Sequence, residues 1–276
     1  MEIIKAHGKV NLGLWVIGKR PDSYHEIYTL FHTIDLHDRI FIKEAPLLSV
    51  KASSPFVPEG EENIVFQAVK KFEEMTGIPQ NYEIFIEKNI PVGAGLGGGS
   101  SDAAAVLLKL NEINQYPLTE EDLFKIAKEL GADVPFFLKG GFAVGEGIGE
   151  KLTFLEKKID QEIFIIYPNV QVSTERVYSA LTEKFLTKKE EIPIIDILLS
   201  EYGEEEIISN MENKLGEVAK ELYPELQEVM NTLEYLGYKP HITGSGSAIF
   251  AFGKPDERLE NICKVKNWKL FTTKLI

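Results

Sequence analysis

The chain has 276 residues, of which 44% are apolar, and a formal net charge of −13. This length can bury a sizeable core and predicts two domains, while the negative charge argues against a nucleic-acid or anionic-membrane partner. The first five residues do not resemble a signal peptide. No apolar run approaches the ~20 residues of a membrane span, since residues 192–199 form only a short, interrupted run. The single cysteine, Cys263, is expected to pack in a core and fits a cytoplasmic location, where thiols stay reduced.

The first predicted strand covers residues 6–16. Apolar residues recur there at every second position, which puts Lys9 and Asn11 together on the opposite face. That face is either the solvent-exposed side of a half-buried strand or a ligand-facing side. Glycines at positions 8 and 13 favour the ligand-facing alternative, because glycines weaken a strand and often mark the close approach of a ligand.

A polar turn follows at residues 18–26 and contains Tyr24 and His25. These two side chains either bind a planar ring by stacking and hydrogen bonding, or close the end of a hairpin. Taken alone, the turn favours the hairpin. Residues 29–42 are predicted to form a further strand, and residues 44–62 form a loop-rich stretch with three prolines.

The stretch on which the site hypothesis depends lies at residues 91–101. Before it, a helix is predicted to begin at Asn63 and to end before Gly77, and residues 82–88 are compatible with a strand. Five glycines then occupy seven positions, and the helix-forming run 103–111 follows. A glycine loop that leads into a helix N-terminus leaves backbone N–H groups available to an anion, so it predicts a phosphate site.

Two known phosphate motifs fit this glycine stretch poorly. The spacing Gly93-x-Gly95-x-x-Gly98 matches the dinucleotide fingerprint, but the acidic residue expected about 20 positions later is missing. A P-loop would need a lysine where this loop has a serine. A tight turn without a ligand is the remaining alternative, and it is disfavoured because turns seldom need this many glycines. The residues expected at the helix N-cap or in its first turn are Ser100, Ser101 and Asp102.

A further helix is predicted between Thr119 and Gly131. The apolar run that follows it, residues 132–138, contains Asp133. A carboxylate in such a run is costly unless a cation or hydrogen-bond donors meet it. That requirement is compatible with a structural role and with a catalytic one. Residues 142–145 are predicted to form the next strand.

A second unit is predicted to begin near residues 155–163, which divides the chain into domains at 1–155 and 156–276. Strands and helices are interspersed without strict βαβ alternation, so the predicted fold class is α+β. The five histidines show no spacing typical of metal ligands, and no metal ligand is assigned. The elements expected in this unit are strands at 162–167 and 268–274, a Gly/Ser turn that runs into a strand at 241–252, and helices at 172–181, 204–221, 224–236 and 255–263.

Three stretches of the chain resemble the three motifs of the GHMP small-molecule kinases. They are Lys9-Val10-Asn11-Leu12, the glycine loop at residues 91–101, and Gly244-Ser245-Gly246. The resemblance spans nearly the whole chain. The extended loop at 97–104, together with Tyr24-His25-Glu26 and the segment 131–137, is similar to a member of the family that phosphorylates a cytidine-diphosphate-linked alcohol.

The resemblance implies a two-domain α+β fold with a ribosomal-protein-S5-like N-terminal domain and a ferredoxin-like C-terminal domain. It also implies ATP as co-substrate, with Mg²⁺ held chiefly by ATP oxygens and water, and Lys9 and Asp133 as the catalytic pair. The residues that it implies for ATP are Asn63, Lys88, Pro91, Val92, Gly93, Ala94, Gly95, Leu96, Gly97, Gly98, Gly99, Ser100 and Ser101. Those that it implies for the cytidine substrate are Asn11, Tyr24, His25, Tyr178, Gly244 and Ser245.

Two other functions stay open at this point. One is phosphorylation of a different alcohol, such as a sugar or a mevalonate-type compound, by another GHMP-type kinase. The other is a nucleotide sensor without catalytic activity on the same scaffold, although the presence of both Lys9 and Asp133 argues against it. A dehydrogenase is disfavoured because the ribose-binding acid is missing. The oligomeric state does not follow from the sequence.

Overall fold

The computed structural model describes residues 2–157, 159–192 and 203–276. Most of the apolar run predicted at 192–199 lies outside these residues. Two long strands, β1 (Glu2–Lys19) and β2 (His25–Glu44), contribute to both of the compact units into which the chain divides. The first unit comprises Met1–Gly8, Leu36–Val92 and Gly97–Gly140, and the second comprises Lys9–Asp35, Gly93–Leu96 and Gly141–Ile276. The single boundary near residue 155 stays a prediction.

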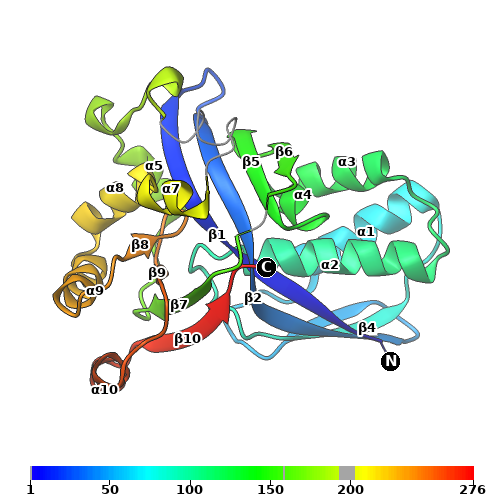
Figure 1. Cartoon of the computed structure of the whole chain (residues 1–276). Helices are drawn as coiled ribbons and strands as arrows, with labels where there is room; N and C mark the ends of the chain where they lie inside the picture. The colour runs from blue at the N-terminus through cyan, green and yellow to red at the C-terminus, as the bar shows by residue number, and fades with distance from the viewer. Residues whose placement is uncertain (1, 158, 193–202) are drawn as a thin grey trace. The chain divides into compact units, whose positions relative to one another are not determined.

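The first unit combines a small sheet with a group of helices. The C-terminal part of β2 pairs antiparallel with β4 (Tyr82–Glu87), which pairs parallel with β3 (Ser49–Ala52). Among the helices, α1 and α2 lie side by side (Figure 1). Apolar residues of these strands and helices form one core. The helices are α1 (Ile64–Thr76), α2 (Gly98–Ile113), α3 (Glu120–Leu130) and α4 (Val134–Phe137), preceded by the 3₁₀ turn η1 (Gly60–Glu62).

Local capping chemistry explains where these helices begin and end. The Asn63 side chain accepts the Val65 N–H at 2.8 Å, and Gly77 closes α1 with a φ of +70°. Thr119 and Asp122 form a reciprocal capping box at the start of α3. The helix ends predicted from these residues are therefore confirmed.

The second unit contains an antiparallel sheet of order β10-β7-β9-β8. Across the sheet these strands are the fourth, first, third and second of the four in chain order, and helices connect the first to the second and the third to the fourth, which is the split βαβ arrangement of ferredoxin-like domains. The N-terminal part of β2 also pairs with β5 (Phe142–Gly147), and β5 pairs with β6 (Lys151–Leu155). The sheet strands are β7 (Glu162–Tyr167), β8 (His241–Ile242), β9 (Ile249–Phe252) and β10 (Lys269–Lys274).

Five α-helices accompany these strands among the described residues. The helix predicted at 204–221 is wrong as a single element, because the chain breaks it after Ser209 and restarts it at Lys214 with Asn213 as the N-cap. Cys263 is buried in the core of this unit, as expected. The helices are α5 (Thr174–Ser179), α7 (Glu204–Ser209), α8 (Lys214–Leu222), α9 (Pro224–Tyr235) and α10 (Glu257–Lys266), with 3₁₀ turns η2 (Glu183–Phe185) and η3 (Lys189–Glu191).

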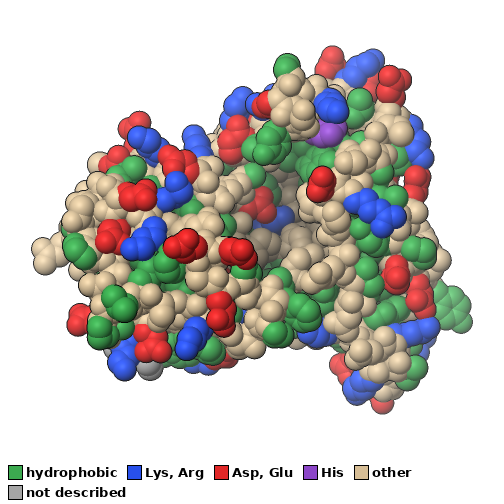
Figure 2. Space-filling model, turned by 180° about the vertical axis from the view of Figure 1, so that it is seen from behind, with side chains coloured by type: hydrophobic (Ala, Val, Ile, Leu, Met, Phe, Trp, Pro, Cys, Tyr) green, Lys and Arg blue, Asp and Glu red, His purple; other side chains and the backbone are tan. Residues whose placement is uncertain are grey.

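The surface carries both signs of charge. On the face shown in Figure 2, acidic and basic side chains are interspersed, although acidic residues outnumber basic ones in the whole chain, 43 to 30. In the part of the chain that the structure describes, no helix combines the length and the apolar character needed to cross a bilayer.

Candidate active site

The glycine loop has the backbone conformation that an anion site requires. Gly93, Gly95 and Gly97 have φ values of +72°, +80° and +70°, a region that residues with a Cβ rarely adopt. Of the two places expected for Ser100, Ser101 and Asp102, the N-cap is occupied by Gly97, which makes no side-chain cap, and the expectation of a place in the first turn is met by Ser100. The first N–H groups of α2 therefore have no side-chain acceptor at the cap, which leaves them available to a phosphate oxygen. Ser100 and Ser101 lie within the first turns of the helix.

Three segments far apart in the sequence meet in the second unit. The Lys9 N–H donates to the Leu96 carbonyl at 3.0 Å, and the Ala248 N–H donates to the Ala94 carbonyl at 2.9 Å. A Cβ on Gly95 would lie 2.6 Å from the Thr243 carbonyl oxygen, so the loop can pass this turn only with a glycine there. The strand, glycine-loop and Gly/Ser-turn motifs recognised in the sequence are thus in direct contact.

A buried polar network holds the Lys9 side chain. Its ammonium group donates to Asn11 Oδ1 at 2.7 Å and lies 5.4 Å from the centroid of the Phe31 ring. The Asn11 amide donates to Thr29 Oγ1 at 2.8 Å, and Thr243 Oγ1 donates to Asn11 Oδ1 at 3.1 Å. Lys9 and Asn11 are each 3% exposed. The solvent-facing alternative for this side of β1 is therefore wrong, since the strand is buried on both faces here.

The Gly/Ser turn is fixed by residues that the sequence did not single out. The Asn213 side chain donates to the carbonyls of Ile242 and Gly244 at 2.7 and 2.8 Å. Its own oxygen accepts the Gly216 N–H and so caps α8. Ser245 Oγ shares a hydrogen bond of 2.8 Å with Thr174 Oγ1. The only sequence signal for Asn213 was its strong N-cap preference, which the apolar periodicity around it obscured.

Two aromatic residues expected to bind cytosine are neighbours. The rings of His25 and Tyr178 are stacked, with centroids 5.2 Å apart and an interplanar angle of 25°. Burial and the nearby Lys19 lower the pKa of His25, so the ring is neutral at physiological pH. Tyr24 is 60% exposed, which leaves its ring accessible to a ligand. The structure thus pairs His25 with Tyr178, and the contacts of all three with a base stay predictions.

The remaining predicted residues lie in the first unit. Asp133 is the N-cap residue of α4 and is half-buried. Since Lys9 belongs to the second unit, the catalytic pair stays a prediction. Asn63 uses both side-chain atoms locally, because it caps α1 and donates to the Pro58 carbonyl at 2.8 Å. The Lys88 side chain is 4% exposed, and its ammonium group contacts the carboxylates of Asp38 and Asp102.

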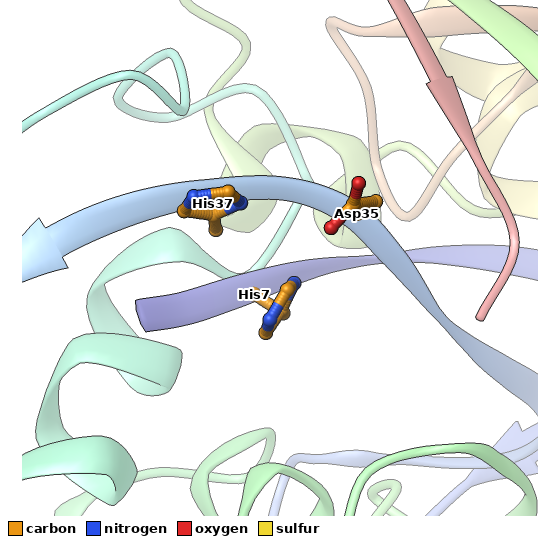
Figure 3. A group of neighbouring side chains, drawn as sticks. All are labelled: His7, Asp35 and His37. Atoms are coloured by element: carbon orange, nitrogen blue, oxygen red, sulfur yellow. The ribbon is translucent and has the colours of Figure 1, made fainter. Parts of the chain in front are cut away.

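Two histidines without any metal-ligand spacing in the sequence are also neighbours. His7 on β1 and His37 on β2 have ring centroids 5.0 Å apart, and Asp35 lies two residues before His37 on the same strand (Figure 3). Side chains of these types bind divalent metals. All three also make other interactions within the protein, so their proximity alone does not define a metal site.

Comparison with known proteins decides the family. Residues 63–141 match the family described as "GHMP kinases N terminal domain", and residues 199–265 match "GHMP kinases C terminal". The chain belongs to the GHMP kinase family. Members of this family are small-molecule kinases, and the α+β fold with N- and C-terminal domains expected from the motifs is confirmed.

Individual GHMP kinases resemble the chain along its whole length. It is 60% identical over 275 residues to the 4-diphosphocytidyl-2-C-methyl-D-erythritol kinase of Persephonella marina, and 54% identical to that of Sulfurihydrogenibium sp., each alignment covering 100% of both chains. A crystal structure of 4-(cytidine 5'-diphospho)-2C-methyl-D-erythritol kinase is 34% identical, with a TM-score of 0.81 over 99% of both chains. The mevalonate kinase of Methanococcus jannaschii, at 17% identity and a TM-score of 0.75, shares the fold.

Proposed function

We propose that this GHMP kinase transfers the γ-phosphoryl group of ATP to the 2-hydroxyl of 4-diphosphocytidyl-2-C-methyl-D-erythritol, which yields the 2-phosphate and ADP. The reaction belongs to the non-mevalonate isoprenoid pathway, and we place it in the cytoplasm. The observation that carries the proposal is the 60% identity, over 100% of both chains, to a kinase named for this substrate. The contact between the three family motifs in the second unit supports it.

In this proposal the glycine loop binds the ATP phosphates. Phosphoryl transfer has a loose transition state, so the protein mainly positions the reactants and neutralises charge on the transferred oxygens. Residues 91–101 supply backbone N–H groups at the uncapped start of α2, where the helix dipole favours an anion. Lys88 and Asn63 are proposed near the adenosine. Their side chains are engaged by Asp38, Asp102 and local backbone groups, so any such role requires those contacts to persist or to rearrange.

Lys9 and Asp133 are proposed as the catalytic pair. A carboxylate is too weak a base to deprotonate an alcohol in advance, so Asp133 would orient the hydroxyl and accept its proton late in the transfer. Lys9 would balance the negative charge that builds up on the transferred group. The neutral Asn11 amide orients the Lys9 ammonium without cancelling its charge.

Mg²⁺ would enter this site as the partner of ATP. Mg²⁺ takes oxygen ligands and usually keeps several waters, so the ATP oxygens and water would provide its ligands, and no side chain of the protein is assigned as one. The ion would offset phosphate charge during transfer.

The cytidine end of the substrate is proposed to bind at the aromatic residues. His25 would hydrogen-bond the cytosine through its neutral ring, and Tyr24 would stack on it, with Tyr178 as a second stacking surface beside His25. Asn11, Gly244 and Ser245 are proposed near the rest of the substrate. Stacking of a base on an aromatic ring contributes ~1–3 kcal/mol in other proteins, which is enough to set a preference for a cytidine-bearing acceptor.

A coupled ADP-release assay tests the proposal. ADP release should be fastest with the cytidyl methylerythritol acceptor when it is compared with mevalonate, homoserine and galactose at equal concentration. An Asp133→Asn variant should retain ATP binding and lose turnover. Faster turnover of any of the other three alcohols would reject the substrate assignment. ATP binding without turnover on any acceptor would favour the nucleotide-sensor alternative.

A further inference from the structure

A buried cluster of one ammonium and two carboxyl groups lies in the first unit. The Lys88 ammonium contacts Asp38 and donates to Asp102 Oδ2 at 2.7 Å. The side chains of Lys88, Asp38 and Asp102 are 4%, 0% and 3% exposed. Two ionised carboxylates on one ammonium would leave an uncompensated negative charge in the interior, which is strongly unfavourable.

The two carboxyl groups differ in their hydrogen-bond donors. Asp38 accepts the backbone N–H groups of Asn89 and Ile90 at 2.6 and 2.8 Å on one oxygen and contacts the ammonium with the other. Asp102 Oδ1 is buried and has no hydrogen-bond partner among the described residues. Donors stabilise an ionised carboxylate, and a bare buried oxygen destabilises it. The geometry therefore makes Asp38 the ionised member and Asp102 the neutral one.

The electrostatic surroundings of Asp102 agree with this assignment. Burial is the largest cause that raises the pKa of Asp102, the neighbouring Asp38 also raises it, and the Lys88 ammonium lowers it, with a net result of about 8. Burial by itself would lower the pKa of Lys88, but the two carboxyl groups raise it, so Lys88 stays charged. Helices α1, α3 and α4 pack against α2. Among the described residues, the charged groups that act on Asp102 are Lys88, after β4, and Asp38, on β2.

The cluster lies directly behind the start of α2. A Cβ on Gly98, the first residue of this helix, would be 3.2 Å from the Lys88 ammonium nitrogen. Asp102 follows one turn later on the same helix. A net negative charge at this place would repel an anion held by the N–H groups of the first turn, whereas a neutral cluster would not.

We propose that Asp38, Lys88 and Asp102 form a positioning cluster that supports the ATP-phosphate loop, and that Asp102 takes part as a neutral carboxylic acid. The inference rests on the proposed binding of ATP at the start of α2. Neutral Asp102 keeps the cluster at zero net charge, because the charges of Lys88 and Asp38 balance. Ionisation of Asp102 in alkaline solution gives the cluster a charge of −1 and weakens ATP binding.

The protonation state is tested by unfolding, without ATP. The pKa of Asp102 is about 8 in the folded protein and about 3.9 in the unfolded chain. Protonated Asp102 therefore stabilises the folded protein fully below about pH 3.9, and this stabilisation is lost as the pH rises through about 8. The Asp102→Asn variant is neutral at every pH and lacks this loss. Between pH 5.5 and 8, the Tm of the native protein should fall by at least about 5 °C relative to that of Asp102→Asn.

A second isosteric variant serves as the comparison. Asp38→Asn removes the ionised carboxylate that accepts hydrogen bonds from one ammonium and two backbone N–H groups. Because these donors lose a charged partner, the Tm of Asp38→Asn at pH 7.5 should lie below that of Asp102→Asn. Parallel pH dependence of the native protein and Asp102→Asn would show that Asp102 is ionised throughout, and this would overturn the inference. A higher Tm for Asp38→Asn than for Asp102→Asn would reverse the assignment of the two carboxyl groups and would also overturn it.

ATP binding is measured by calorimetry at pH 7.5 and 9, where the terminal phosphate is already ionised. The neutral fraction of Asp102 falls from roughly three-quarters at pH 7.5 to roughly one-tenth at pH 9, so the Kd for MgATP of the native protein should rise by up to about eightfold, the value expected if only the neutral form binds. The ratio of the two Kd values should stay near one for Asp102→Asn, whatever its affinity at pH 7.5. Equal ratios for both proteins would overturn the link to ATP. Failure of the native protein to bind ATP at either pH would instead reject the proposed function, and the unfolding comparison would still decide the state of Asp102.

Discussion

Replacement of Gly95 by alanine tests the contact between the glycine loop and the Gly/Ser turn. The new Cβ would lie 2.6 Å from the Thr243 carbonyl oxygen and 3.0 Å from the Gly246 carbonyl oxygen, and both of these atoms belong to the backbone. Backbone atoms cannot rotate away as a flexible side chain can. The positive φ of +80° adds conformational strain. Gly95→Ala should therefore displace the loop or the turn, and it should reduce the free energy of unfolding.

Gly93→Ala is the matched control for this change. Gly93 has a similar φ of +72°, but a Cβ there would meet nothing within 4 Å. Both variants carry left-handed strain of roughly 1–2 kcal/mol, and both lose the same unfolded-state entropy. Gly95→Ala alone adds the overlap, which costs about 1–3 kcal/mol when packed atoms must move. The difference between the two variants isolates the contact.

Urea and thermal unfolding provide the measurement. The Tm of Gly95→Ala should lie below that of Gly93→Ala by about 2–12 °C, given roughly 2–4 °C per kcal/mol for a chain of this size. Activity does not discriminate between the variants, because both glycines belong to the loop proposed to bind ATP. Equal unfolding midpoints would refute the close contact between this loop and the turn.

Three further predictions concern the proposed reaction and its scaffold. Lys9→Ala should lower kcat in the ADP-release assay by at least ~10²-fold with an unchanged circular dichroism spectrum. Lys5→Ala, at an exposed lysine on the same strand, should leave kcat unchanged. Near-normal turnover of Lys9→Ala would contradict the proposed role of Lys9. Tyr24→Ala and Tyr178→Ala should each raise KM for the cytidine substrate about five- to 100-fold and spare KM for ATP, so equal effects on both KM values count against a cytosine site. Asn213→Ala removes a helix cap and two carbonyl bonds and should cost about 2–4 kcal/mol in urea unfolding; a loss below about 0.5 kcal/mol would show that other groups fix the turn.

Features set by neighbours in the sequence could be predicted, and helix ends are the clearest case. Asn63, Gly77 and Thr119 act on backbone groups within one helical turn, so their roles follow from residue type and position. Residue type alone did not separate the N-cap of α2 from its first turn, because Ser100 and Asp102 are also good cap residues. Gly97 takes the cap position with its positive φ, and Asp102 is drawn inward to Lys88 instead.

Features set by distant partners could not be predicted from periodicity. The alternation along β1 was compatible with a solvent-facing side that contains Lys9. In a strand that is covered on both faces, however, the alternation of apolar and polar residues does not indicate which face contacts solvent. Asp38 and Lys88 are 50 residues apart, and nothing near either of them indicates the other. The break before α8 also depends on distant partners, because the Asn213 side chain donates to two carbonyl groups that are 29 and 31 residues away. Motif resemblance did indicate that the Lys9 strand, the glycine loop and the Gly/Ser turn belong together, and the structure shows these three segments in contact.

The net charge of −13 bears on the proposed binding of two anionic ligands. The charge of the whole molecule opposes ATP and the diphosphate substrate, so attraction must come from groups close to the phosphates. The uncapped start of α2 provides unpaired N–H groups. The Lys9 ammonium donates to the neutral amide of Asn11, and it is proposed to balance the charge of the transferred phosphoryl group. In our proposal Asp102 on α2 is neutral, so it adds no negative charge near the proposed phosphate site at the start of this helix. The attraction proposed for the phosphates therefore comes from backbone N–H groups and one ammonium group close to them, and not from the charge of the whole molecule.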